Sequence, residues 1–258
     1  MKCSFLKKGL VNLFLLASLV NTSGFYLPTN QNTSAENATV NIKQTIPHYD
    51  NIAVLLIDMQ YSFMDDLDGA ERQELVANQN NVLDYCKEHG ISVYEIKYLG
   101  EGDTINSLQG RLKELEQAGN LHQITKPWDD SFQRTDLADQ LTNENIEYVL
   151  LMGLYASACV EGTGKGTLRN GFQFLTSRSL IADPDYWGND ENIEWFRTRG
   201  LHRDKYTDLL NIISTGSIEK NMPKKLLPYW KEEIKFSPIA KSRKDIYTPK
   251  VLSSSYQK

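Results

Sequence analysis

An unbroken apolar run, Ile52-Ala53-Val54-Leu55-Leu56-Ile57, constrains the fold more than any other stretch of this sequence. Six consecutive apolar residues leave no solvent-facing side of a strand, so the run predicts a strand buried on both faces. Strands of this kind occur in parallel sheets that are covered by helices on each side. We therefore expect an α/β fold in which helices alternate with parallel strands.

The remaining pattern fits this expectation. Further strands are predicted at Ile91–Tyr98, Leu121–Thr125, Tyr148–Met152, Phe172–Ser177 and Leu209–Ser214. Helices are predicted at 69–88, within 103–119, from Asp136, and at 163–170, and residues 184–200 suit a helix-bearing insertion or lid. The alternation predicts a six-stranded parallel sheet flanked by helices on both faces.

Three chemically active side chains follow or end predicted strands: Asp58, Lys126 and Cys159. Each also has an ordinary interpretation, as a loop cap, a solvated lysine and a buried structural cysteine. Parallel strands place their carboxyl ends on one edge of the sheet, so the three side chains are expected to converge there. A carboxylate can accept the thiol proton, an ammonium can stabilise anions, and a thiolate can attack a carbonyl carbon.

Charge and terminal composition suggest how the chain is divided. The net charge is −5, which argues against general nucleic-acid binding, but residues 219–258 carry ten Lys or Arg and four Asp or Glu. Lys2, Lys7 and Lys8 precede an apolar stretch, Gly9–Val20, which fits a secretory signal. We expect a signal peptide at 1–24, a flexible linker at 25–48, a catalytic domain at 49–218 and a basic extension at 219–258.

The predicted signal implies export to the periplasm or the medium, with an uncleaved membrane anchor as the alternative. Three cysteines are too few for a disulfide scaffold, and a Cys86–Cys159 bridge is not expected because Cys86 lies on a predicted helix. No Cys/His cluster suggests a zinc site, and we expect no metal and no cofactor. Membrane contact is expected only through the N-terminal segment or the basic extension.

Three blocks in order resemble the isochorismatase-like cysteine hydrolase family. Ile57-Asp58-Met59-Gln60 with Phe63 is similar to its opening strand and aspartate. Lys126 with Ser131-Phe132, Thr135 and Leu137 is similar to its lysine block, and 153–160 with Gly171-Phe172 and Asp183 is similar to its nucleophile block. The resemblance covers about residues 50–216.

This resemblance implies a set of roles. Asp58, Lys126 and Cys159 would be catalytic, and a cis peptide would join Leu154 to Tyr155. The backbone N–H groups of Tyr155 and Cys159 would form an oxyanion hole. Family members often form dimers or tetramers, so a homo-oligomer is expected.

The sequence departs from the family pattern in three places. Ala156 stands where a threonine is often found, so one supporting hydrogen bond would be either absent or supplied by Ser157. The insertion after Asp183 is long, and no metal-binding Asp/His cluster follows Asp58. Nicotinamidase-like members carry that cluster and isochorismatases proper lack the cysteine, so both activities are disfavoured.

The expected activity is hydrolysis of a small amide or related C–N bond through a thioester. Phe63, Trp128, Tyr155 and Trp187 are candidates to contact a planar substrate, although they could equally be core aromatics. Three other interpretations stay open: an exported binding protein that retains the fold without catalysis, isochorismatase-type hydrolysis of another bond, and a redox-active thiol that does not hydrolyse amides.

Overall fold

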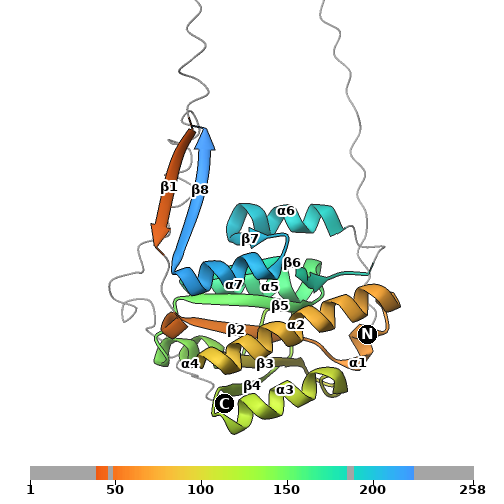
Figure 1. The fold of residues 1–258 in the computed structure, drawn as a ribbon. Helices are drawn as coiled ribbons and strands as arrows, with labels where there is room; N and C mark the ends of the chain where they lie inside the picture. The colour runs from red at the N-terminus through yellow and green to blue at the C-terminus, as the bar shows by residue number, and fades with distance from the viewer. Residues whose placement is uncertain (1–38, 46–48, 185–188, 224–258) are drawn as a thin grey trace, which may run out of the picture.

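The computed structural model describes residues 39–45, 49–184 and 189–223 (Figure 1). The signal peptide predicted at 1–24, most of the predicted linker, Trp187 and the chain after residue 223 lie outside the described residues. Among the residues that are described, no helix is both long and apolar enough to cross a bilayer.

A six-stranded parallel sheet forms the centre of the molecule and confirms the predicted fold class (Figure 1). Its strands lie in the order β4-β3-β2-β5-β6-β7. Their bounds are β2 Ile52–Ile57, β3 Ser92–Tyr98, β4 Leu121–Lys126, β5 Tyr148–Leu154, β6 Gln173–Ala182 and β7 Leu201–Arg203. The first four agree closely with the strands predicted from the sequence, and β6 continues five residues beyond its predicted end at Ser177.

The strand order reverses direction at the middle of the sheet. From β2 the chain moves outward through β3 to the edge strand β4, and then returns to place β5 on the opposite side of β2. The chain therefore leaves β2 toward one half of the sheet and leaves β5 toward the other half. In open α/β sheets, ligands bind outside the carboxyl ends of the strands at such a point.

Helices cover both faces of the sheet. Buried residues of α2 (Gly69–His89), α3 (Asn106–Gln117) and α7 (Tyr206–Thr215) join one core cluster, and those of α4 (Leu137–Asn143) and α6 (Asn189–Arg199) join the other. The short α1 (Tyr61–Met64) and a 3₁₀ turn at Tyr49–Asn51 flank β2, and α5 (Glu161–Arg169) follows β5. Asp68 caps α2 by accepting hydrogen bonds from the N–H groups of Ala70 and Glu71.

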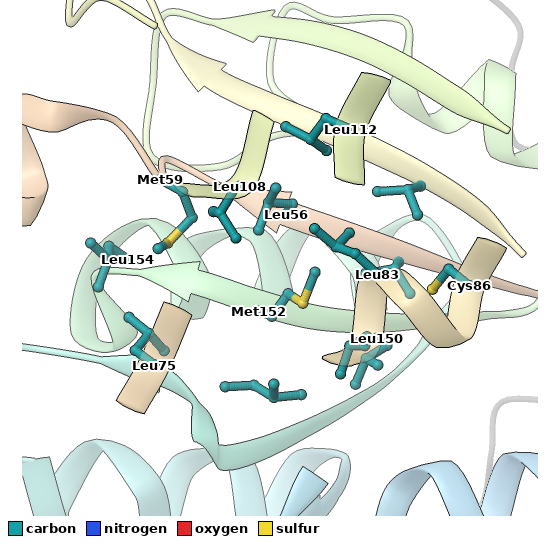
Figure 2. Packing of buried hydrophobic residues seen from close by; sticks show 14 of the residues in the cluster. Leu56, Met59, Leu75, Leu83, Cys86, Leu108, Leu112, Leu150, Met152 and Leu154 are labelled. Atoms are coloured by element: carbon teal, nitrogen blue, oxygen red, sulfur yellow. The ribbon is translucent and has the colours of Figure 1, made fainter. Parts of the chain in front are cut away.

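The position of β2 explains why its sequence contains no polar residue. Ile52, Val54 and Leu56 pack into the cluster formed with α2 and α3, and the alternate residues Ala53, Leu55 and Ile57 pack into the opposite cluster. Figure 2 shows Leu56 among Met152, Leu83 and Leu108 in the first cluster. Each large buried side chain of this kind contributes about 1.5–3 kcal/mol to folding.

The sixth strand was predicted at the wrong place. Residues Leu209–Ser214 belong to the helix α7, and the sixth strand is β7, only three residues long. Leu209, Ile212 and Ile213 are buried, which is the i, i+3, i+4 spacing of a helix face rather than the alternation of a strand.

A separate two-stranded antiparallel sheet pairs β1 (Thr39–Thr45) with β8 (Ser217–Pro223). Figure 1 shows it projecting from the body of the molecule beside α7. Strand structure therefore occurs inside the range predicted as linker, and β8 crosses the boundary predicted at 218/219.

Candidate active site

Asp58 is the first residue after β2 and lies at the point where the sheet diverges. Its backbone has a positive φ of 53°, a conformation that non-glycine residues seldom adopt, and its N–H donates to the carbonyl of Ile96 over 2.9 Å. The residue is 1% exposed. The turn therefore fixes a carboxylate in the interior at the carboxyl edge of the sheet.

Lys126 reaches this carboxylate from the edge strand β4, two strands away. Its Nζ lies 2.7 Å from Asp58 Oδ2, donates to the carbonyl of Trp128 over 3.2 Å, and sits 4.5 Å from the centre of the Tyr98 ring. The lysine is fully buried. The ammonium is thus held by an anion, a carbonyl and an aromatic face, which together offset the loss of its hydration.

Only one oxygen of Asp58 is used by this pair. Oδ1 is buried and has no hydrogen-bond partner of normal geometry among the described residues. An unsatisfied buried carboxylate oxygen is costly, and it is also an available proton acceptor.

Cys159 lies in a π-helical turn, Ala156–Val160, between β5 and α5. The turn is tied to the end of β6 by Asp183, a fully buried residue whose two carboxylate oxygens accept hydrogen bonds from the Ser157 N–H at 2.8 Å and the Ser157 hydroxyl at 2.9 Å. Ser157 therefore makes a supporting hydrogen bond next to Ala156, which is one of the two outcomes left open by the sequence. Asp183 holds the turn that carries the cysteine.

Gly153 brings this turn close to Asp58. It has a φ of +136°, and a Cβ atom there would lie 2.0 Å from the carbonyl oxygen of Ile57. Only glycine permits this approach of β5 to β2. The pairing of β5 with β6 shifts register at the same place, between Leu151 and Gly153.

The thiol of Cys159 lies between two carboxylates. It interacts with Asp58, and its Sγ lies 3.7 Å from Oδ1 of Asp129. The sequence places Asp129 in a predicted loop and does not predict a role for it. The only available signal is its position three residues after Lys126, which does not reveal where a loop side chain points.

Burial and these charges shift the pKa values of all three groups. Burial raises the pKa of Asp58, and this effect exceeds the opposing effects of Lys126 and the Cys159 thiol. Burial also raises the pKa of Cys159, reinforced by Asp58 and opposed by Lys126. Burial by itself would lower the pKa of Lys126, but Asp58 and Cys159 beside it raise that pKa overall. The resting site therefore holds a charged lysine and a neutral thiol.

Aromatic residues predicted to contact substrate occupy different environments. Phe63 packs edge-to-face between Tyr155 at 5.6 Å and Tyr98 at 6.2 Å, and the Tyr155 hydroxyl donates to Asp66 over 2.6 Å. Trp128 is 47% exposed beside Lys126. A substrate role for Phe63, Trp128 and Tyr155 stays a prediction, and Trp187 lies outside the described residues.

The peptide bond between Leu154 and Tyr155 is cis, as the resemblance implied. It immediately precedes the turn that carries Cys159. The oxyanion hole assigned to the N–H groups of Tyr155 and Cys159 stays a prediction. Within the three described ranges, no group of three or more His, Cys, Asp or Glu side chains could hold a metal ion.

The fold and the site together define a three-layer α/β protein of the hydrolase type, with an Asp–Lys pair beside a cysteine at the sheet's divergence. Comparison with known families agrees with this class: the isochorismatase domain profile matches residues 52–197, more than half of the chain. The chain belongs to the isochorismatase domain family. No curated protein sequence matched the chain.

Solved structures of similar fold are distant in sequence. The nicotinamidase of Staphylococcus aureus is 17% identical with a TM-score of 0.54, over 60% of this chain and 99% of that one. An isochorismatase from Pseudomonas putida is 15% identical with a TM-score of 0.54, over 64% and 93%. A cysteine hydrolase from Pseudomonas syringae is 14% identical with a TM-score of 0.52, over 67% and 98%. At these identities the likeness shows a shared fold.

Proposed function

We propose that this protein is a cysteine hydrolase that cleaves a small amide or related C–N bond through a thioester intermediate. The observation that carries the proposal is the buried Asp58–Lys126 pair next to Cys159, with Asp58 Oδ1 unpaired. A proton acceptor, a fixed cation and a nucleophile are thus assembled at the place where α/β folds bind ligands.

Acylation begins when Asp58 accepts the thiol proton. The thiolate then attacks the carbonyl carbon, a C–S bond forms, and the carbonyl electrons move to oxygen. The backbone N–H groups of Tyr155 and Cys159 stabilise this oxyanion. When the tetrahedral intermediate collapses, the C–N bond breaks, and protonated Asp58 gives its proton to the departing amine or ammonia.

Deacylation uses the same carboxylate. Asp58 accepts a proton from water while the hydroxyl oxygen attacks the thioester carbon. The C–S bond then breaks and the sulfur regains a proton, so that an amide and water yield a carboxylic acid and an amine. Lys126 stays protonated throughout, and its charge lowers the pKa of Asp58 against the effect of burial, which favours the ionised form that starts each cycle.

The substitution Cys159→Ala tests the proposal on the purified full chain. A panel of small amides and ureides is assayed for ammonia release, and each reaction is quenched for mass detection of an acyl adduct. We expect the variant to lose turnover by at least roughly a thousandfold, and to lose the adduct entirely, because no other group can form the thioester.

The matched control is Cys86→Ala. Cys86 is buried in the cluster formed with α2, away from the site, so this variant keeps both turnover and adduct. Turnover that survives Cys159→Ala would falsify the mechanism. Absence of turnover by the wild-type chain on the whole panel would instead favour a binding protein that retains the fold.

A further inference from the structure

Asp129 is the second carboxylate at the thiol, and the proposed mechanism does not use it. Its Oδ1 lies 3.7 Å from Cys159 Sγ, and the residue is exposed, whereas Asp58, which also interacts with this thiol, is buried. The thiol therefore interacts with one buried carboxylate and one solvent-exposed carboxylate.

The backbone that carries Asp129 is fixed against α5. The Thr163 hydroxyl donates to the carbonyl of Asp129 over 3.4 Å and lies 2.7 Å from the buried Ser131 hydroxyl. A Cβ at Gly162 would lie 3.3 Å from the Cβ of Asp129, so the loop and the helix are in close contact there. This packing places the backbone and Cβ of Asp129 close to the turn that carries the sulfur.

Asp129 has no strong donor of its own. In the described part of the chain no Lys or Arg pairs with it, and the hydrogen bond to its carboxylate comes from the weak S–H donor of Cys159. The neighbouring Asp130, in contrast, is neutralised by Arg169. Two acceptor oxygens near the thiol therefore lack a strong hydrogen-bond donor among the described residues: Oδ1 of Asp129 and the buried Oδ1 of Asp58.

A carbonyl carbon in position for attack lies about 3–3.5 Å from the sulfur. Oδ1 of Asp129 lies 3.7 Å from that sulfur, so a group bonded to the carbonyl carbon on the side of Asp129 can come within hydrogen-bonding reach of it. A donor such as N–H₂ or an ammonium one or two bonds away would satisfy it. A carboxylate at the same place would be repelled.

We propose that Asp129 is a specificity-determining residue that selects amides with an N–H donor group, neutral or cationic, beside the scissile carbonyl and rejects those with a carboxylate there. Ureides and α-amino amides belong to the selected class. The inference rests on the proposed function, since it assumes that the substrate carbonyl is attacked by Cys159.

Alkylation of Cys159 by two small reagents tests this selection without requiring turnover. Iodoacetamide presents an amide N–H₂ and iodoacetate a carboxylate, and both transfer their CH₂ group to the sulfur with loss of iodide. We expect Asp129→Asn to lower the ratio of the iodoacetamide rate to the iodoacetate rate by about tenfold at low salt, because the variant no longer repels the anion. Both reagents consume the same thiolate, so a changed thiol pKa cancels in the ratio.

The charge-matched control is Asp139→Asn, a substitution on α4 that should leave the ratio unchanged. Rates are measured at Cys159 by peptide mass spectrometry, so that other cysteines do not contribute. An unchanged ratio in Asp129→Asn overturns the inference and leaves the proposed function standing. Absence of amide turnover by the wild-type chain on the whole panel overturns the proposed function, whatever the alkylation ratio is.

A second measurement applies the same logic to substrates. Glycinamide, propionamide and malonamate share the group CH₂–CO–NH₂ and differ in carrying an ammonium, a methyl group or a carboxylate. The wild-type chain should rank them in that order by kcat/KM, and Asp129→Asn should compress the range. A wild-type preference for malonamate would contradict the inference.

Discussion

At the scale of single residues, the two carboxylate oxygens of Asp58 have different surroundings. Oδ2 pairs with Lys126, which opposes the rise in the pKa of Asp58 that burial causes, and Oδ1 is left without a hydrogen-bond partner of normal geometry among the described residues. A fully paired carboxylate would be a weak base, and an unpaired buried one would be protonated. In the proposed mechanism, the pair with Lys126 therefore leaves Asp58 able to accept a proton in the interior.

Lys126→Met tests this balance through the pH dependence of kcat/KM. Asp58 acts as a base only when ionised, so kcat/KM rises with pH through its pKa. Lys126 lowers that pKa, so its removal raises the pKa further and moves the acid limb to higher pH. The free energy of unfolding at neutral pH should also fall by about 3–5 kcal/mol, because a buried charge loses its partner.

Lys97→Met is the matched control. Lys97 pairs with the exposed Asp103, and a pair of this kind contributes about 0–1 kcal/mol. It should shift neither the acid limb nor stability appreciably. An acid limb that stays in place in Lys126→Met would show that another group accepts the proton.

The three strand-end residues could be predicted from sequence because a parallel sheet fixes the position of whatever follows each strand. The positions of Asp58 and Lys126 needed only the strand boundaries and that rule, whereas Cys159, which follows β5 in a turn, was singled out with the help of the family resemblance. Asp129 could not be predicted, since its place at the thiol depends on contacts between a loop and α5. The roles of Trp128 and Trp187 depend on side-chain directions and are still predictions.

At the scale of elements, the approach of β5 to β2 at Gly153 positions the cysteine turn. Replacing Gly153 with Ala would put a Cβ 2.0 Å from the Ile57 carbonyl oxygen, and the atoms it would meet are all backbone. The φ of +136° adds strain for any other residue. We expect Gly153→Ala to cost at least about 2 kcal/mol in the free energy of unfolding and to impair turnover.

Gly110→Ala provides a control with the opposite sign. Gly110 lies within α3, and a Cβ added there would meet no atom within 4 Å, so alanine should stabilise the helix by about 0.5–1 kcal/mol. Both changes are read from urea unfolding curves. Equal stability of Gly153→Ala and the wild type would mean that β5 can move away from β2 without cost.

The limits of a helix or strand could be predicted where its sequence carries a clear apolar pattern, and could not be predicted where it is too short to show one. The uninterrupted apolar run predicted the limits of β2, and the helix predicted at 69–88 matches α2 to within one residue. The strand β7 has three residues, too few to show a pattern, and the apolar residues of α7 were assigned to a strand instead. The predicted number of six strands is still correct, because the strand wrongly predicted at α7 offsets the missed strand β7.

At the scale of the whole molecule, two buried cysteines report different events. Cys86 packs in the core between α2 and the sheet (Figure 2), whereas Cys159 sits at the carboxyl edge. In a Cys3→Ser background, since Cys3 lies outside the described residues, thiol reagents should modify Cys159 first. Cys86 should react at least about a thousandfold more slowly than a free thiol, because it requires global opening.

The check is time-resolved alkylation followed by peptide mass spectrometry, with and without urea. Urea should speed the reaction of Cys86 in proportion to unfolding. Rapid modification of Cys86 in native buffer would show that the cluster under α2 opens locally. Burial is the main cause of the raised thiol pKa at both sites, and it is complete only at Cys86, which favours the same order of reaction.

The central position of β2 also has a consequence during synthesis. It is the first strand of the large sheet to be made, yet one of its edges pairs with β5, which begins at Tyr148, 91 residues after Ile57. At ribosomal rates this interval is roughly 5–20 s. During that time the nascent chain presents an apolar strand edge that can pair with other chains. We therefore expect its biogenesis to depend on a holding chaperone or on a low local density of translating copies.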